Sequence, residues 1–136
     1  MRFVLILVLV LIAAGMAYIR LAPSDPAVWH VAPETREPGE YPGEGSFMAV
    51  VEAGEEALAD LDAVAVATPR TQRLAGAPED GMVTWVTRSR VMGFPDYTTA
   101  IHRDGLLTVE GRLRFGRSDM GVNQARIEGW LEEAGI

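Results

Sequence analysis

The chain begins with an unbroken run of apolar residues. Residues 3–19 carry no charge and lie between Arg2 and Arg20. As an α-helix this run would extend about 25 Å at 1.5 Å per residue, which crosses a bilayer when the flanking side chains reach toward the headgroups. The run therefore predicts a transmembrane helix over residues 1–20.

A cleaved signal peptide is the competing interpretation, because residues 15–17 (Gly-Met-Ala) offer small side chains at cleavage spacing. We favour a retained anchor, since residues 18–19 prolong the apolar run beyond that point. Arg2 and the terminal amine together oppose a single Arg20, and this bias favours a cytoplasmic N-terminus. The expected protein crosses the cytoplasmic membrane once, with its domain on the outer (periplasmic) side.

Proline and glycine dominate the next segment. Residues 21–46 contain five of the eight prolines and three glycines. This composition disfavours a helix and predicts an extended, acidic linker. An apolar island interrupts it at residues 28–31 (Val-Trp-His-Val). Either Trp29 sits in the headgroup belt of the membrane or the island docks on the folded domain. His30 has no neighbouring metal-ligand residues, so we expect an ordinary surface histidine.

A stripe of apolar residues at helical spacing opens the compact domain, which we place at residues 47–136. Ser46 suits the N-cap position, and acidic residues occupy the side opposite the stripe. The pattern predicts a helix over residues 46–61. The stripe consists of Phe47, Val50, Val51, Gly54, Leu58 and Leu61.

Alternating apolar and polar residues then predict antiparallel strands. Asp104-Gly105 indicates a type I′ hairpin, the strongest short-range signal in the chain. Residues 93–96 (Gly-Phe-Pro-Asp) indicate a four-residue loop that would place Met92 opposite Tyr97. Since successive side chains point to opposite faces, these turns divide the sheet into an apolar face and an arginine-rich face. The arginine-rich face, expected to be open, carries Arg88, Arg90, Arg112 and Arg114.

Two further elements complete the predicted domain. A fourth strand is expected near residues 70–75, and a closing helix over residues 120–134, with Ser118 or Asp119 as its cap. The predicted fold class is α+β: a transmembrane helix, then a two-layer domain in which a helix, four antiparallel strands and a helix follow one another.

Three separated motifs carry a family resemblance: Arg88-Ser89-Arg90, Gly93-Phe94-Pro95-Asp96 and residues 112–127. Together they resemble the bacterial family called domain of unknown function 1499, over residues 47–134. The resemblance implies an uncharacterised membrane-anchored protein and brings no assigned catalytic role. For the motif residues we expect structural roles, with Asp119 as a helix cap and Asn123 hydrogen-bonded on the apolar face of the closing helix. These motif residues are Arg117, Ser118, Asp119, Asn123 and Arg126.

The amino-acid composition and motifs of the chain narrow the set of expected partners and cofactors. The chain has no cysteine, no lysine and a net charge of −7, which disfavours a nucleic-acid partner. Its two histidines, His30 and His102, do not have metal-site spacing, and neither a Walker loop nor a dinucleotide-binding glycine motif is present. We therefore expect no metal and no cofactor.

The arginine-rich face is the candidate site for function. Four guanidinium groups could bind an anionic lipid headgroup, a cell-wall carboxylate or an acidic protein partner. A merely solvated sheet face is the simpler interpretation of the same residues. The alternative function is a small hydrolase-like enzyme that uses His102 with Thr87 or Ser89, although no nucleophile elbow or orienting carboxylate can be placed. Binding is the favoured hypothesis over catalysis.

Overall fold

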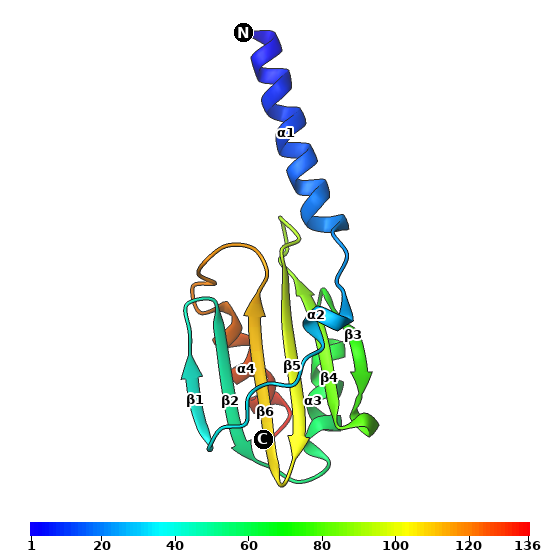
Figure 1. The fold of residues 1–136 in the computed structure, drawn as a ribbon, viewed down its shortest axis with the longest axis vertical. Helices are drawn as coiled ribbons and strands as arrows, with labels where there is room; N and C mark the ends of the chain where they lie inside the picture. The colour runs from blue at the N-terminus through cyan, green and yellow to red at the C-terminus, as the bar shows by residue number, and fades with distance from the viewer.

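The structure, a computed structural model, describes all residues 1–136 and contains one antiparallel sheet of six strands (Figure 1). The strand order across the sheet is β1-β2-β6-β5-β4-β3. At each edge the last two strands, β1 with β2 and β3 with β4, follow one another along the chain. The strands are β1 (Gly39–Pro42), β2 (Ser46–Glu52), β3 (Thr71–Ala77), β4 (Met82–Arg88), β5 (Pro95–Arg103) and β6 (Leu106–Leu113).

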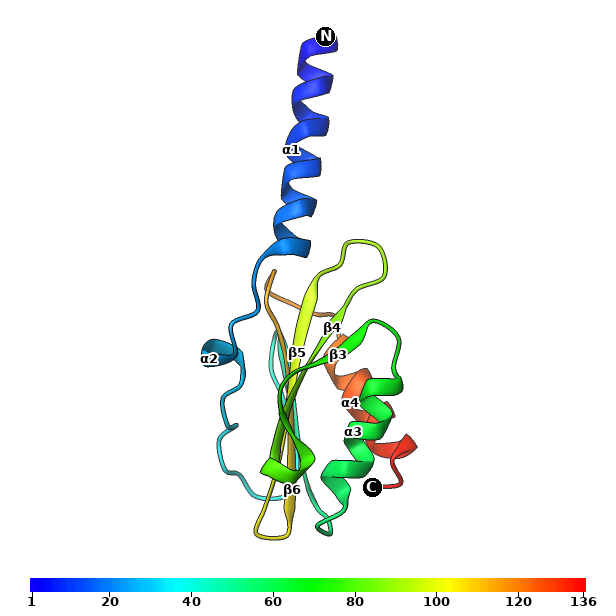
Figure 2. The ribbon, with the colours of Figure 1, turned by 90° about the vertical axis from the view of Figure 1, so that its right-hand side faces the viewer.

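Helices lie on both sides of this sheet and beyond one end of it. Two of them, α3 and α4, cover one face, whereas the short α2 and the chain around it lie on the other face (Figure 2). The first helix, α1, projects from one end of the domain, and the C-terminus lies toward the other end (Figure 1). The helices are α1 (Arg2–Leu21), α2 (Pro26–Trp29), α3 (Ala57–Ala67) and α4 (Val122–Glu133), with a 3₁₀ turn η1 at Pro78–Asp80.

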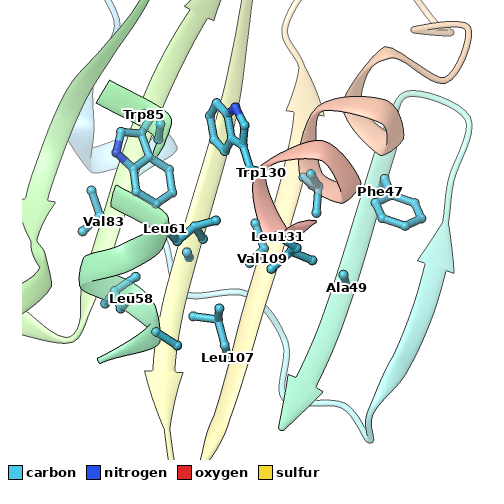
Figure 3. Close-up of a cluster of buried hydrophobic side chains, with 14 residues drawn as sticks. Phe47, Ala49, Leu58, Leu61, Val83, Trp85, Leu107, Val109, Trp130 and Leu131 are labelled. Atoms are coloured by element: carbon cyan, nitrogen blue, oxygen red, sulfur yellow. The ribbon is translucent and has the colours of Figure 1, made fainter. Parts of the chain in front are cut away.

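The hydrophobic core fills the space between the sheet and the pair α3 and α4 (Figure 3). Trp85 of β4 and Trp130 of α4 meet edge to face with their ring centroids 5.6 Å apart. Leu61 and Ile127, from the two helices, are fully buried in the same cluster. Burial of these large side chains supplies the main driving force for folding. The α+β class predicted from the sequence is confirmed.

The predicted helix over residues 46–61 is wrong in its first half. Residues 46–52 form strand β2, and helix α3 begins only at Ala57. Phe47, Met48, Ala49 and Val50 are all buried, so β2 has two covered faces. A strand buried on both faces carries consecutive apolar residues, and such a run can match helical spacing by chance.

The segment interpreted as a linker, residues 21–46, contains two elements of its own. Helix α2 begins after Asp25, whose side chain accepts a hydrogen bond from the backbone N–H of Ala27 (2.9 Å). Strand β1 forms the edge of the sheet, and its proline, Pro42, lies at its last position, where a missing N–H is tolerated. The sheet thus has two more strands than the four predicted.

One predicted turn is confirmed and the other is displaced. Asp104 and Gly105 both adopt positive φ, 54° and 77°, as a type I′ turn requires. Tyr97, however, pairs with Val86 and not with Met92, because β4 ends at Arg88 and residues 89–94 form the loop. The shift is six residues, an even number, so the division of side chains between the two faces is unchanged.

The remaining elements lie close to their predicted places. Strand β3 includes the predicted residues 71–75 and contains a bulge between Arg73 and Ala75. Helix α4 falls within the predicted residues 120–134 and buries Asn123 completely. Met120, the first residue of the predicted helix, lies outside α4 and is 92% exposed, because the helix begins only at Val122.

Candidate anion-binding site

Two of the four predicted arginines bind the chain's own N-terminal segment. Arg112 donates hydrogen bonds to the carbonyl of Trp29 (2.7 Å) and to the Thr99 hydroxyl (3.2 Å). Arg114 donates to the carbonyl of Pro23 (2.9 Å) and to the phenol oxygen of Tyr97 (3.0 Å). The expectation of an open face is therefore wrong for these two side chains, which the segment around α2 covers.

Aromatic and polar contacts reinforce this cover. The Trp29 ring stacks on Tyr97, and the Arg112 guanidinium lies 5.6 Å from the centroid of the same indole. His30 Nδ1 is hydrogen-bonded to the Thr84 hydroxyl at 2.8 Å. Of the two sequence-based alternatives for the apolar island, docking on the domain is the one observed. Burial lowers the pKa of Arg112, and the nearby Glu110 carboxylate (3.7 Å) partly opposes this effect.

The other two predicted arginines lie in a different place. Arg88 and Arg90 line a pocket of about 390 Å³ together with Gly93 of the loop between β4 and β5. This loop lies at the end of the domain from which α1 projects (Figure 1). Arg20, from the last turn of α1, and Arg70, immediately before β3, complete a set of four guanidinium groups. The fold brings these four arginines together from three separate parts of the chain.

Backbone geometry positions the pocket's side chains. Arg88 donates to the carbonyls of Gly93 (3.0 Å) and Ile19 (3.4 Å), and Arg70 donates from Nε to the carbonyl of Arg88 (3.1 Å). Gly93 has a φ of 71°, and a Cβ atom there would approach the Arg20 side chain to 3.0 Å. A glycine at this position therefore allows both the turn and the close approach of Arg20.

No carboxylate neutralises this cluster. None of the four arginines forms an ion pair, and their hydrogen bonds within the chain all go to backbone carbonyls. The lining contains no aspartate or glutamate, although the whole chain has a net charge of −7. We name this set, Arg20, Arg70, Arg88 and Arg90, the arginine pocket.

The arginine pocket has the donors that an oxyanion needs. Each guanidinium is a planar fork that can donate two parallel hydrogen bonds to phosphate or carboxylate oxygens. Two neutral lining residues can add to them, the amide of Gln72 and the hydroxyl of Ser89. The Ser89 oxygen already accepts a hydrogen bond from the N–H of Phe94 (2.9 Å), which leaves its O–H free to donate.

The sequence patterns do not identify Arg20 and Arg70 as site residues. Arg20 stands at the border of the apolar run, and Arg70 stands at the start of the expected fourth strand, whose pairing register the sequence leaves open. The backbone N–H of Arg88 donates to the carbonyl of Arg70 (2.9 Å), so the pairing of β3 with β4 sets the two side by side. The correct register for β3 would have identified Arg70, but no local pattern indicated that α1 would reach the same pocket.

The motif residues at the start of α4 form a separate network. The Asp119 carboxylate accepts hydrogen bonds from the backbone N–H groups of Gly121 and Asn123 and from the Asn123 amide (2.7 Å). The side-chain oxygen Oδ1 of Asn123 accepts a hydrogen bond from Arg126 (3.1 Å), which also pairs with Asp96 (3.3 Å). Asp119 therefore caps the helix start, and Asn123 ties this cap to Arg126. Structural roles were predicted for both.

The pKa values of the two carboxyl groups in this network, those of Asp96 and Asp119, shift in opposite directions. Burial raises the pKa of Asp96, and this effect outweighs the stabilising charge of Arg126. Burial also acts to raise the pKa of Asp119, but its hydrogen bonds from Asn123 and Gly121 prevail and leave the pKa lowered. The motif's other two residues contribute less: the Ser118 hydroxyl accepts from the N–H of Met120 (3.2 Å), and Arg117 is exposed.

His102 is not beside either of its proposed partners. Its Nε2 lies 2.8 Å from the carbonyl of Ala53 and donates to it. Thr87 is at the far end of the β4–β5 pair, opposite Asp96, and its hydroxyl is hydrogen-bonded to that of Thr71 (2.9 Å). Ser89 lies in the loop beyond β4. The chain also holds no group of three or more His, Asp or Glu side chains arranged to bind a metal ion.

Comparison with known proteins settles the family. The model of a family described as "Protein of unknown function (DUF1499)" matches residues 22–133. The chain belongs to this family. The match begins at Ala22, so the segment that carries α2 and β1 is part of the DUF1499 region together with the sheet that it covers. Comparison with curated proteins found no significant match.

Proposed function

We propose that this DUF1499 protein is a membrane-anchored envelope domain that binds an anionic ligand in the arginine pocket. The observation that carries the proposal is the cluster of four guanidinium groups without a carboxylate partner, in a chain that is otherwise acidic. Like charges repel, so gathering them has a cost that a bound anion relieves. Phosphate and carboxylate groups fit this donor set.

The proposal also places the protein in the envelope. Helix α1 has 20 residues, contains no buried residue and is long and apolar enough to span a membrane. A retained α1 with the N-terminus in the cytoplasm would cross the cytoplasmic membrane once. The arginine pocket would then lie on the outer side, where anionic lipids, cell-wall groups and acidic proteins are the available partners.

Thermal unfolding of the full chain in neutral detergent tests the binding. An anion that binds only the folded state stabilises it by about 2.7 kcal/mol at 100 times its Kd. We expect pyrophosphate, phosphate or citrate to raise the Tm more than chloride does at equal ionic strength. This increase should shrink as salt rises, because salt screens the charges.

The matched variants are Arg70→Gln with Arg90→Gln, and Arg103→Gln as the control. Arg90 makes no hydrogen bond, and Arg70 makes one side-chain bond at an exposed position, so the double variant should fold. It should lose the anion-dependent increase in Tm. Arg103 is exposed at the opposite end of β5, and its replacement removes one charge without touching the pocket. Equal anion responses in all three proteins would refute the proposal.

A further inference from the structure

The last turn of α1 contacts the loops that surround the arginine pocket. Arg20 donates a hydrogen bond to the carbonyl of Val91 (2.6 Å), and Arg88 reaches back to the carbonyl of Ile19 (3.4 Å). The Tyr18 ring meets Phe115 edge to face, with 6.1 Å between the centroids. Val91 and Gly93 of the β4–β5 loop and Phe115 after β6 therefore lie against residues 18–20 of the helix. The β4–β5 loop is the one that approaches the end of α1 in Figure 1.

Helix length determines where this contact lies relative to a bilayer. Twenty residues at 1.5 Å each give about 30 Å, which equals the thickness of the hydrocarbon core. Nearly the whole of α1 is then needed to cross the bilayer, and Arg20 in its last turn lies at the boundary between the hydrocarbon core and the headgroup layer. The loop residues that touch this turn lie at the same depth. Only residues 22–25 separate α1 from α2, so the domain lies close to the end of the helix.

Side chains at this end suit a lipid interface. Val91 is 71% exposed and Met92 is 37% exposed at the tip of the β4–β5 loop. The arginine pocket lies directly beside these two apolar side chains, since Arg88, Arg90 and Gly93 flank them in sequence. Apolar residues bordered by arginines are typical of surfaces that rest on anionic membranes.

From this geometry we infer that the ligand of the arginine pocket is the phosphate headgroup of an anionic lipid in the same bilayer that α1 spans. This inference rests on the proposed anion binding and names its ligand. The lipid phosphate accepts hydrogen bonds from Arg20, Arg70 and Arg90, while Val91 and Met92 lie among the upper segments of the acyl chains. A lipid phosphate would neutralise the positive charge of the pocket and would also lie at the level in the bilayer where the pocket is expected. A free anion accounts only for the charge.

Lipid selectivity is the first measurement. The full chain is reconstituted in vesicles of phosphatidylcholine and phosphatidylglycerol, and the retained lipids are counted by native mass spectrometry. We expect enrichment of phosphatidylglycerol in the wild type. Each pocket arginine removed should reduce the ratio of bound phosphatidylglycerol to phosphatidylcholine about fivefold, the equivalent of 1 kcal/mol per arginine near a membrane surface. The variant with Arg70→Gln and Arg90→Gln lacks two of them and should therefore lose about 25-fold, whereas Arg103→Gln, outside the pocket, should not change the ratio.

The second measurement is the depth of the β4–β5 loop in the bilayer. Because the chain has no cysteine, a label attached to an introduced cysteine reports on that position alone. A nitroxide label on Val91→Cys should be accessible to oxygen and shielded from a water-soluble relaxation agent. A label on Asp104→Cys, in the exposed hairpin at the other end of the domain, should show the reverse. A Val91 label as accessible to water as the Asp104 label would overturn the inference.

The two proposals can fail separately. If pyrophosphate stabilises the wild type but phosphatidylglycerol is not enriched, the pocket binds a soluble anion, and only the lipid assignment is refuted. If neither occurs, the proposed anion binding is refuted as well. Enrichment that survives in the double variant would show that the lipid binds elsewhere, and this would also refute the assignment.

Discussion

The indole of Trp29 lies flat on the phenol ring of Tyr97, with ring centroids 3.9 Å apart and an angle of 14° between the planes. This contact joins the segment after α1 to the first part of strand β5, and Arg112 strengthens it by donating to the Trp29 carbonyl. The segment 22–31 therefore behaves as a third layer on the sheet. This layer covers a face of the sheet that the alternation of side chains along the strands would by itself leave exposed to solvent.

Removing the stacked ring should release this layer. We expect Trp29→Ala to lower the free energy of unfolding by about 1–3 kcal/mol, because a half-buried aromatic side chain and its stacking energy are both lost. Amide hydrogen exchange of residues 22–31 should accelerate, while that of β5 and β6 should change little. Trp29→Phe should retain most of the protection, and Val28→Ala, at an exposed position, serves as the control. Unchanged exchange in Trp29→Ala would show that other contacts hold the layer.

The buried amide of Asn123 should be equally sensitive. Asn123→Ala removes one hydrogen-bond partner of the Asp119 carboxylate and one of the Arg126 guanidinium, although each keeps its other partners. Losing these bonds from a buried position costs about 1–3 kcal/mol. Denaturant unfolding of a chain that begins at Ala22 measures this loss, since the omitted helix α1 contains no buried residue and its contacts with the domain do not involve α4. The neighbouring Gln124→Ala should leave the midpoint nearly unchanged, and an equal midpoint for Asn123→Ala would mean that the cap network does not support α4.

Asp62 should make stability depend on acid pH. Burial acts to raise its pKa, but hydrogen bonds from Arg73 and Trp85 prevail, so the pKa is lowered from 3.8. A carboxyl group with a lowered folded-state pKa stabilises the protein above its unfolded-state pKa, and this stabilisation is lost as pH falls through the folded-state value. The difference in unfolding free energy between the wild type and Asp62→Asn should therefore be constant above about pH 5 and shrink at lower pH. A difference that does not vary with pH would contradict the pKa shift.

Membrane topology gives a fourth prediction. The C-terminus lies toward the end of the domain opposite α1, so a reporter fused after Ile136 should not obstruct the loops beside that helix (Figure 1). A reporter that is active only outside the cytoplasm should work, because Arg2 and the terminal amine favour a cytoplasmic N-terminus. Activity of a cytoplasmic reporter alone would reverse the orientation. Mature chains that begin near Tyr18 would instead show that α1 is cleaved.

Several features were predictable because their causes are local. The apolar run before Arg20 forms a helix, and the Asp104-Gly105 pair forms the turn that its positive φ values allow. Strand alternation assigned side chains to the correct faces even though the β4–β5 register was wrong by six residues. Helix α4 buries Asn123 as its spacing indicated. Each of these depends on bonds or periodicity within a few residues.

By itself, then, the sequence determined an apolar N-terminal helix, an antiparallel sheet with one apolar face, a closing helix and the family to which these belong. Only the tertiary structure decided that residues 46–52 form a strand, because β1 and β6 pair with it from either side. It also decided that Trp29 covers Arg112, and that Arg20 and Arg70 join Arg88 and Arg90 in one pocket. Burial and charge clustering depend on which distant segments meet, and a local pattern of residues does not contain that information.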